Sequence, residues 1–302
     1  MTAAMEYHNP VMLRETVDGL NIDPAGTYVD VTFGGGGHSR EILRRLGPDG
    51  RLFAFDQDED AQANALDDPR FTLIPENFRY LKRFLRFHNV RQVDGVLADL
   101  GVSSHQFDVA ERGFSTRFDG ALDMRMSKKN KLDAYRVVNE YDEANLRRIF
   151  ADYGELRNAP VIARVIVEAR TQVPIRNTEQ LKSVVSRLFP AHKGNKFMAM
   201  IYQSIRIEVN QEMEALREFL EQSLEILKPG GRLSVLSYHS LEDRLVKRFM
   251  KNGMFEGEPE RDMFGNFSVP FKLVGKMAVP SDEEINTNSR ARSAKLRVAE
   301  KL

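Results

Sequence analysis

Short apolar runs alternate with amphipathic segments along the first hundred residues of the chain. The apolar runs predict strands, and the segments between them, in which apolar positions recur every three or four residues, predict helices. The predicted strands are 27–33, 51–56, 71–74 and 93–100, and the predicted helices are 39–46, 58–66 and 78–87. Apolar strands joined by helices indicate a parallel sheet that is covered on both faces.

This alternation stops between residues 107 and 200. Strand signals are scarce there, and amphipathic helices are predicted at 140–153, 160–171 and 178–188, the last with Thr178 as its N-cap. The later predictions are a long helix at 199–227, a strand at 232–238, a helix from 240 to 250, a loop at 252–270 and a strand at 294–299. We therefore expect an α/β domain formed by residues 1–106 and 201–302, with an all-helical insert at 107–200.

Composition excludes several classes of protein. No window approaches 18 uninterrupted apolar residues, so we expect no membrane span, and residues 1–10 lack the features of a signal peptide. The chain has no cysteine, and no two histidines are spaced i, i+4, so we expect no metal site and a cytoplasmic location. Since 44 basic residues balance 44 acidic ones, any nucleic-acid binding must depend on local patches.

Four successive glycines, residues 34–37, follow the first predicted strand and open the first predicted helix. Glycine has no Cβ, so such a loop can adopt positive φ and let a ligand approach its backbone. Asp56 ends the second predicted strand, where a carboxylate can accept both hydroxyls of a ribose. The strand, glycine loop, helix and acid together predict a nucleotide-sized pocket.

The spacing of the glycines bears on the identity of the ligand. A dinucleotide fingerprint requires G-x-G-x-x-G, but Gly34 and Gly36 are followed by Ser39 at the third position, which disfavours a pyrophosphate. The sequence LKPGG at 227–231 is common before a strand of S-adenosylmethionine-dependent folds. We therefore favour S-adenosylmethionine as cofactor. A nicotinamide-dependent oxidoreductase and a methyltransferase acting on a small molecule or another nucleic acid remain alternatives.

Seven ordered motifs carry a family resemblance. They are HNPVMLRE at 8–15, GGGGHS at 34–39, ADLGVSS at 98–104, ERGFS at 111–115, LDMRM at 122–126, YHSLEDR at 238–244 and RARS at 290–293. From about His8 to Lys301 the chain resembles the bacterial small-subunit ribosomal RNA (cytosine-N4) methyltransferases, the RsmH/MraW family. The resemblance implies a class I, Rossmann-like methyltransferase sheet with a helical insert, S-adenosylmethionine as donor, and a decoding-centre cytosine of 16S rRNA as target.

The same resemblance assigns the cofactor contacts to Gly36, Gly37, His38, Asp56, Phe78, Asp99 and Gln106. Alternatives stay open for several of them. Phe78 could stack on the adenine or be an ordinary core residue, and His38 could be a polar residue at a helix start. Asp30, at the end of the first strand, could face the ammonium group of the donor or cap the turn that follows.

Asp99 is the candidate catalytic residue. The exocyclic amine of cytosine is a poor nucleophile because its lone pair conjugates with the ring. An acceptor close to the amine N–H would localise that lone pair and orient it toward the methyl group. Asp99 is followed by Leu-Gly-Val and not by the Pro-Pro-aromatic sequence of many amino-methyltransferases. A role limited to contact with the cofactor is the alternative.

Two basic segments are candidate RNA contacts. The first contains Arg112, Arg117 and Arg125, with Phe114 and Phe118 between them, and the second contains Arg290 and Arg292. Arginines can bind phosphates and aromatic rings can stack on exposed bases, although a solvated basic surface is the alternative. The expected partner is small-subunit rRNA, either free or assembled. A homodimer is compatible with the sequence.

Overall fold

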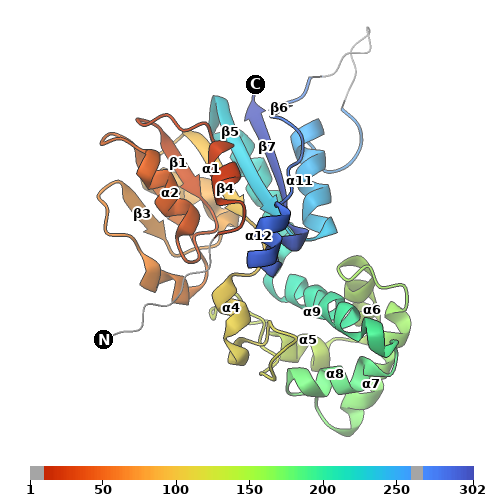
Figure 1. Ribbon diagram of the computed structural model, residues 1–302. Coiled ribbons are helices and arrows are strands. Elements are labelled where there is room, and N and C mark those ends of the chain that lie inside the picture. The colour runs from red at the N-terminus through yellow and green to blue at the C-terminus, as the bar shows by residue number, and fades with distance from the viewer. Residues whose placement is uncertain (1–9, 260–267) are drawn as a thin grey trace. The chain divides into compact units, whose positions relative to one another are not determined.

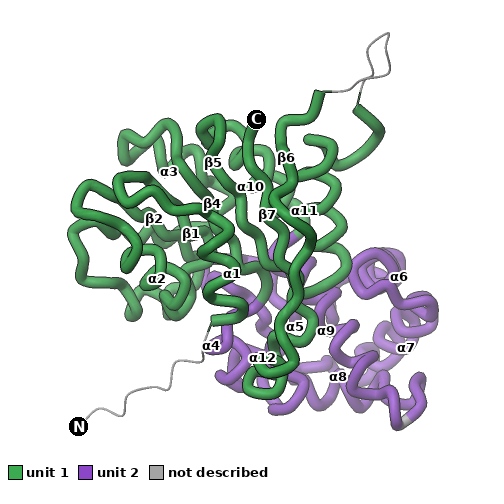
Figure 2. Tube along the Cα trace, turned by 45° about the horizontal axis from the view of Figure 1, so that its top comes forward, with its two compact units in different colours: residues 1–101, 213–302 green, residues 102–212 purple. Residues whose placement is uncertain are grey.

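The computed structural model describes residues 10–259 and 268–302. His8, Asn9, most of the segment examined for a signal peptide and the centre of the predicted loop 252–270 lie outside the described residues. The chain separates into two compact units (Figure 2). Residues 1–101 and 213–302 form the first unit, and residues 102–212 form the second.

Among the described residues, seven strands of the first unit form one sheet, in the order β3-β2-β1-β4-β5-β7-β6 (Figure 1). They are β1 (Thr27–Asp30), β2 (Arg51–Phe55), β3 (Phe71–Ile74), β4 (Val93–Asp99), β5 (Leu227–Ser237), β6 (Phe271–Leu273) and β7 (Lys295–Lys301). The first five are parallel, whereas β7 is antiparallel to both β5 and β6. The predicted α/β class with a mostly parallel sheet is confirmed. Strand order reverses between β1 and β4, where open α/β sheets bind ligands.

Helices cover the two faces of this sheet. The described elements are α1 (Leu13–Asp18), α2 (Gly37–Arg45), η1 (Glu59–Asn64), η2 (Phe78–Tyr80), α3 (Leu81–Phe87), α10 (Glu212–Ile226), α11 (Ser240–Asn252), α12 (Asp282–Thr287) and η5 (Ser289–Ser293). Leu52 of β2 packs in one core cluster with Ile42 of α2. Phe55, which points to the opposite face because side chains alternate along a strand, contacts Phe84 of α3 with ring centroids 6.5 Å apart.

The second unit is built from helices and has a core of its own. Its elements are α4 (Ser104–Asp108), η3 (Ala110–Arg112), α5 (Ala134–Glu140), α6 (Glu143–Asp152), α7 (Ala159–Gln172), α8 (Thr178–Ser186), η4 (Ala191–Lys193) and α9 (Gly194–Asn210). Ile149, Ile162 and Ile201 are fully buried in one cluster that joins α6, α7 and α9. Within the described chain, no helix combines the length and apolarity needed to cross a membrane.

Several predicted elements were wrong in detail. The helix predicted at 199–227 is two helices, because Gln211 adopts the left-handed conformation (φ 50°, ψ 43°) that ends α9. The N-cap of α8 is Asn177 and not Thr178, since the Asn177 side chain accepts from the N–H of Gln180. Of the helix predicted at 58–66, only Glu59–Asn64 is helical, as a 3-10 segment, and the short strand β6 was not predicted.

Replacing Gln211 by glycine is expected to stabilise the protein by about 0.5–1 kcal/mol, because glycine adopts positive φ without the steric cost that a Cβ adds. Denaturant unfolding of the two proteins measures the difference. The control is Ala199→Gly at an exposed position inside α9, which should destabilise the protein by about 1 kcal/mol because the backbone there is helical. A Gln211→Gly protein that is less stable than the parent would contradict this expectation.

Candidate functional site

Three acids lie at one edge of the sheet in the first unit. Asp30 ends β1, Asp56 directly follows β2, and Asp99 ends β4. Because these strands are parallel neighbours, their carboxyl ends share an edge. This is the edge at which the strand order reverses, and this topology predicts that a ligand binds there.

The glycine loop between β1 and α2 also lies at this edge. Gly34 and Gly36 have φ values of 51° and 76°, a region that favours glycine. A Cβ on Gly37 would lie 2.0 Å from Cγ of Pro10, so the missing side chain makes room for the segment that precedes α1. The loop therefore has a steric reason for its glycines. Cofactor contact by Gly36 and Gly37 stays a prediction.

Asp30 stabilises the segment around the glycine loop through hydrogen bonds to its carboxylate. It is fully buried, and its carboxylate accepts from the hydroxyl of Ser39 (2.7 Å) and from the N–H of Thr32 (3.1 Å). Burial raises the pKa of Asp30, against the opposing effect of the nearby His38. Of the two roles open for Asp30, these contacts favour capping of the turn.

Asp56 connects the glycine loop to the end of β2. One carboxylate oxygen accepts from the N–H of Gly34 (2.7 Å), and the other accepts from the N–H of Asp58 (2.8 Å). Burial raises the pKa of Asp56 to about 6, although the two N–H groups act in the opposite direction. Each carboxylate oxygen has a second lone pair, so Asp56 can still accept two ligand hydroxyls.

Asp99 lies between a tyrosine and a histidine. The hydroxyl of Tyr238 donates to Oδ1 of Asp99 (2.6 Å), and Nδ1 of His38 is 3.7 Å from Oδ2. The backbone N–H of Asp99 donates to Oγ1 of Thr32 (2.6 Å). The Asp99 side chain is 24% exposed, so a ligand can reach it. Burial raises the pKa of Asp99, so this carboxylate accepts a proton more readily than an ordinary aspartate does.

The orientation of His38 is fixed by the chain before α1. Its Nε2 lies 3.2 Å from the carbonyl oxygen of Val11, and a carbonyl can only accept, so Nε2 carries the hydrogen. The remaining nitrogen, Nδ1, then faces Asp99. His38 is 5% exposed and lies in the first turn of α2, so it is a buried partner of Asp99 and not a surface residue at a helix start.

Tyr238 was not assigned a role from the sequence. It follows β5, and its backbone N–H donates to Glu242 (2.8 Å), the residue that also forms the capping box of α11 with His239. Burial and the adjacent Asp99 raise the pKa of Tyr238 well above its ordinary value, so the phenol stays protonated and remains a donor. The contact depends on β5 lying beside β4, which local sequence does not reveal.

Phe78 and Gln106, two further predicted cofactor contacts, belong to different units of the protein. Phe78 is half-buried at η2, and its ring lies 5.4 Å from that of Phe219 in an edge-on arrangement, which agrees with a core role on at least one side. Gln106 belongs to the second unit, where it forms a capping box with Ser103 and is 4% exposed. Cofactor contact by Phe78 and Gln106 stays a prediction.

The arginines proposed for RNA binding differ in accessibility. Arg112 is 7% exposed and donates to the carbonyl oxygens of Arg125 (2.9 Å) and Met126 (3.3 Å), so it acts within the second unit. Arg125 forms a two-bond ion pair with Asp123. Arg117 is exposed. These surroundings favour Arg117 as the phosphate contact of this segment.

The remaining predicted RNA contacts also include both buried and exposed side chains. Phe114 is buried in the core of the second unit, so it cannot stack on a base, whereas Phe118 is 50% exposed. Arg290 and Arg292 both lie in η5 of the first unit, with Arg290 half-buried and Arg292 exposed. Arg292 and Phe118 therefore have the exposure that an RNA contact requires.

Comparison with known proteins identifies relatives along the whole chain. The family model described as the MraW methylase family matches residues 5–302. A protein of Flavobacterium johnsoniae named ribosomal RNA small subunit methyltransferase H is 74% identical over 302 residues, which is 100% of both chains. A protein of the same name from Bacteroides thetaiotaomicron is 58% identical over 298 residues, or 98% of each chain. A solved rRNA methylase of Streptococcus thermophilus is 14% identical, with 99% of each chain covered and a TM-score of 0.43. The chain belongs to the MraW methylase family.

Proposed function

We propose that this protein transfers a methyl group from S-adenosylmethionine to the exocyclic N4 amine of a cytosine in small-subunit rRNA, in the cytoplasm. Support comes from family membership and from the function named for the relatives. The observation in the site that carries the proposal is Asp99, a reachable carboxylate at the ligand edge of the sheet with one oxygen held by Tyr238.

The residues of this edge fit S-adenosylmethionine. Asp56 has two lone pairs left for the ribose hydroxyls, and the positive φ values of Gly34 and Gly36 belong to a loop that a ligand can approach closely. Phe78 is the candidate for packing on the adenine. When bound, the cofactor supplies an electrophilic methyl group on a sulfonium.

Asp99 can supply both orientation and proton acceptance for the target amine. The Oδ2 atom, which faces His38, can accept from the amine N–H and hold the nitrogen lone pair in line with the methyl carbon. Methyl transfer would break the sulfur–carbon bond of the sulfonium, release the neutral thioether and leave the amine nitrogen positive, and Asp99 would accept the proton whose loss restores the nitrogen to neutrality. To reach this acid the cytosine must be unpaired or flipped out of its stack.

Replacing Tyr238 by phenylalanine is expected to lower kcat about 10-fold, because Asp99 loses one of the groups that orient it. The hydroxyl also stabilises the ionised form of Asp99, so its removal should raise the pKa of Asp99 further and move the acid limb of the kcat profile to higher pH. Steady-state kinetics across pH measures both effects.

Tyr135→Phe is the matched control, because it makes the same chemical change in the second unit. It should leave the pH profile unchanged. A Tyr238→Phe enzyme with lower activity but an unshifted acid limb would indicate a general loss of structure and contradict the positioning role.

One assay tests the proposed function. The protein is incubated with labelled S-adenosylmethionine and small ribosomal subunits that lack the modification, and the modified nucleoside is identified by mass spectrometry. We expect N4-methylcytidine. Label on a ring carbon, on a ribose or on ribosomal protein would refute the proposal, and substitution of NADH for the methyl donor should give no reaction.

A further inference from the structure

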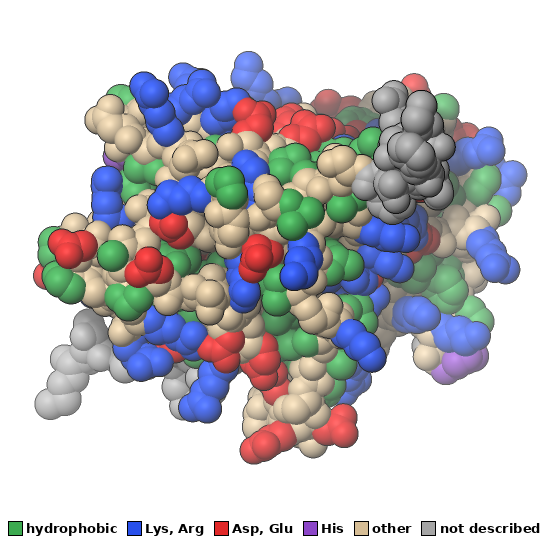
Figure 3. Space-filling model, turned by 90° about the horizontal axis from the view of Figure 1, so that it is seen from above, with side chains coloured by type: hydrophobic (Ala, Val, Ile, Leu, Met, Phe, Trp, Pro, Cys, Tyr) green, Lys and Arg blue, Asp and Glu red, His purple; other side chains and the backbone are tan. Residues whose placement is uncertain are grey.

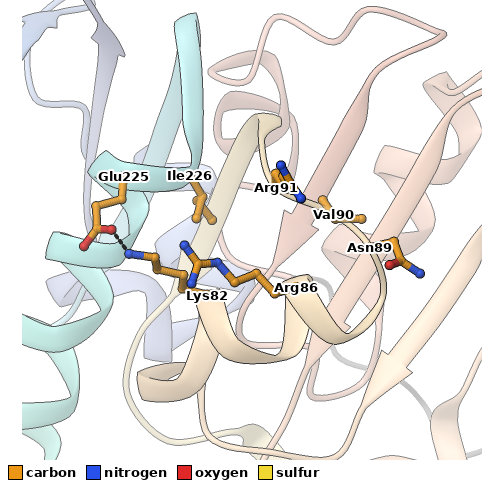
Figure 4. Close-up of a pocket in the computed structure, with 7 residues that line it drawn as sticks. All are labelled: Lys82, Arg86, Asn89, Val90, Arg91, Glu225 and Ile226. Atoms are coloured by element: carbon orange, nitrogen blue, oxygen red, sulfur yellow. Dashed lines mark hydrogen bonds and ion pairs between the residues drawn. The ribbon is translucent and has the colours of Figure 1, made fainter.

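A hollow of about 680 Å³ lies in the first unit, between α3 with the turn that follows it and the end of α10 (Figure 4). Its lining residues are Lys82, Arg86, Asn89, Val90, Arg91, Glu225 and Ile226. Arg91 precedes β4 and Ile226 precedes β5, so the hollow lies at the amino ends of these strands. The seven residues of β4 separate it from Asp99 by about 20 Å.

The basic side chains near this hollow fall into two groups. Arg79 forms a two-bond ion pair with Glu218 (2.6 and 2.9 Å), and Lys82 pairs with Glu225, so these two residues hold η2 and α3 against α10. By contrast, Arg86 and Arg91 are exposed, and their guanidinium groups have no carboxylate partner among the described residues. Ion pairs within the protein therefore account for the presence of Arg79 and Lys82 at this place, but not for that of Arg86 and Arg91.

A rigid turn places these two arginines on the same hollow. At the end of α3 the N–H of Val90 donates to the carbonyl of Leu85 (2.8 Å), and the N–H of Asn89 donates to the carbonyl of Arg86 (2.9 Å). Together with the left-handed φ of 60° at Asn89, these bonds form a Schellman motif. Because the motif also buries Val90, the positions of Arg86 before it and Arg91 after it are fixed by backbone geometry.

The charge and the neighbouring aromatic residue indicate what the hollow can bind. Lys82, Arg86 and Arg91 carry three positive charges against one negative charge on Glu225. Phe87, next to Arg86, is 79% exposed, the highest value among the exposed large hydrophobic residues of the described chain. Basic and acidic side chains are intermixed over much of the face shown in Figure 3, and the net charge of the chain is zero, so RNA binding requires local sites.

We propose that this hollow binds backbone phosphates of the ribosomal RNA substrate, at a distance from the methylated base, and that Phe87 stacks on an adjacent unpaired base. The inference rests on the proposed function, because it takes the substrate to be RNA. Guanidinium groups bind phosphate oxygens through paired hydrogen bonds, and exposed aromatic rings stack on bases of any sequence. The site contributes affinity and register for a large substrate and takes no part in the chemistry.

The test measures binding and methylation of small ribosomal subunits over a range of salt concentrations. The Arg86→Gln/Arg91→Gln protein is compared with an Arg44→Gln/Arg83→Gln control, which removes the same charge from exposed arginines that do not line the hollow. Neutralising two phosphate contacts should reduce the slope of log affinity against log salt by about 1 to 2. Phe87→Ser should weaken binding without changing that slope.

Three further measurements separate the possible outcomes. Affinity for S-adenosylhomocysteine and the melting temperature should equal those of the parent, and turnover of a short cytidine-containing oligonucleotide should not change. Equal losses in the control variant, or an unchanged salt slope in the hollow variant, would overturn the inference. A parent protein that binds subunits but does not methylate them would instead refute the proposed function and leave this binding test valid.

Discussion

Replacing Asp99 by asparagine is expected to lower kcat by about 10²- to 10⁴-fold, the range that positioned acid–base groups contribute. Asparagine keeps the size of the side chain, and its carbonyl oxygen can still accept from the hydroxyl of Tyr238. What it loses is the ability to take up the proton that the amine releases. Single-turnover kinetics with saturating cofactor and small ribosomal subunits measures this step.

The same variant decides between the two roles of Asp99. If Asp99 acts on the amine, the dissociation constant of S-adenosylmethionine should change little while kcat falls. If Asp99 only contacts the cofactor, affinity for the cofactor should fall and the rate at saturation should recover. Asp94→Asn is the control, because Asp94 lies on the same strand at its opposite end and pairs with Lys228. It should leave kcat unchanged.

The parts of the fold that depend on local sequence were predicted well. The buried strands β1, β2 and β4 and the glycine loop carry their signal within a few residues, because burial on both faces requires continuous apolar runs. The break at Gln211 has no such signal, since glutamine is a good helix former and non-glycine residues rarely adopt the positive φ found there. The three-residue strand β6 exists only because β7 provides its hydrogen-bonding partner.

In the candidate site, too, contacts between residues distant in sequence could not be predicted. Asp56 was predicted because it follows an apolar strand directly in sequence, whereas Asp99, which ends β4, was assigned by the family resemblance and by the chemistry that a carboxylate offers an amine. The contact between Tyr238 and Asp99 joins residues 139 positions apart and depends on the strand order, so it could not be predicted from spacing. Arg112 was predicted as an RNA contact from its charge, but long-range hydrogen bonds to the backbone at residues 125 and 126 bury it.

Replacing Asp56 by asparagine is expected to weaken S-adenosylmethionine binding on the order of 100-fold. Two hydroxyl-to-carboxylate hydrogen bonds become weaker, and each bond to a charged acceptor contributes roughly 1.5–3 kcal/mol. In the parent, the two carboxylate oxygens of Asp56 accept from the N–H groups of Gly34 and Asp58. In the variant, the amide NH₂ of asparagine faces one of these N–H groups, and because both are donors, we expect the glycine loop to shift. Isothermal titration with S-adenosylhomocysteine measures the affinity without turnover.

The pH dependence of this affinity provides an independent test. The ionised form of Asp56 is the better acceptor, and its pKa is about 6, so affinity in the parent should be nearly constant above pH 7 and fall as pH drops through 6. The Asp56→Asn protein should lose this dependence. Glu59→Gln, which removes a nearby exposed carboxylate, should retain it. A parent affinity that stays constant from pH 7 to pH 5 would contradict the role of Asp56, because a carboxylate that binds ribose cannot become protonated without loss of affinity.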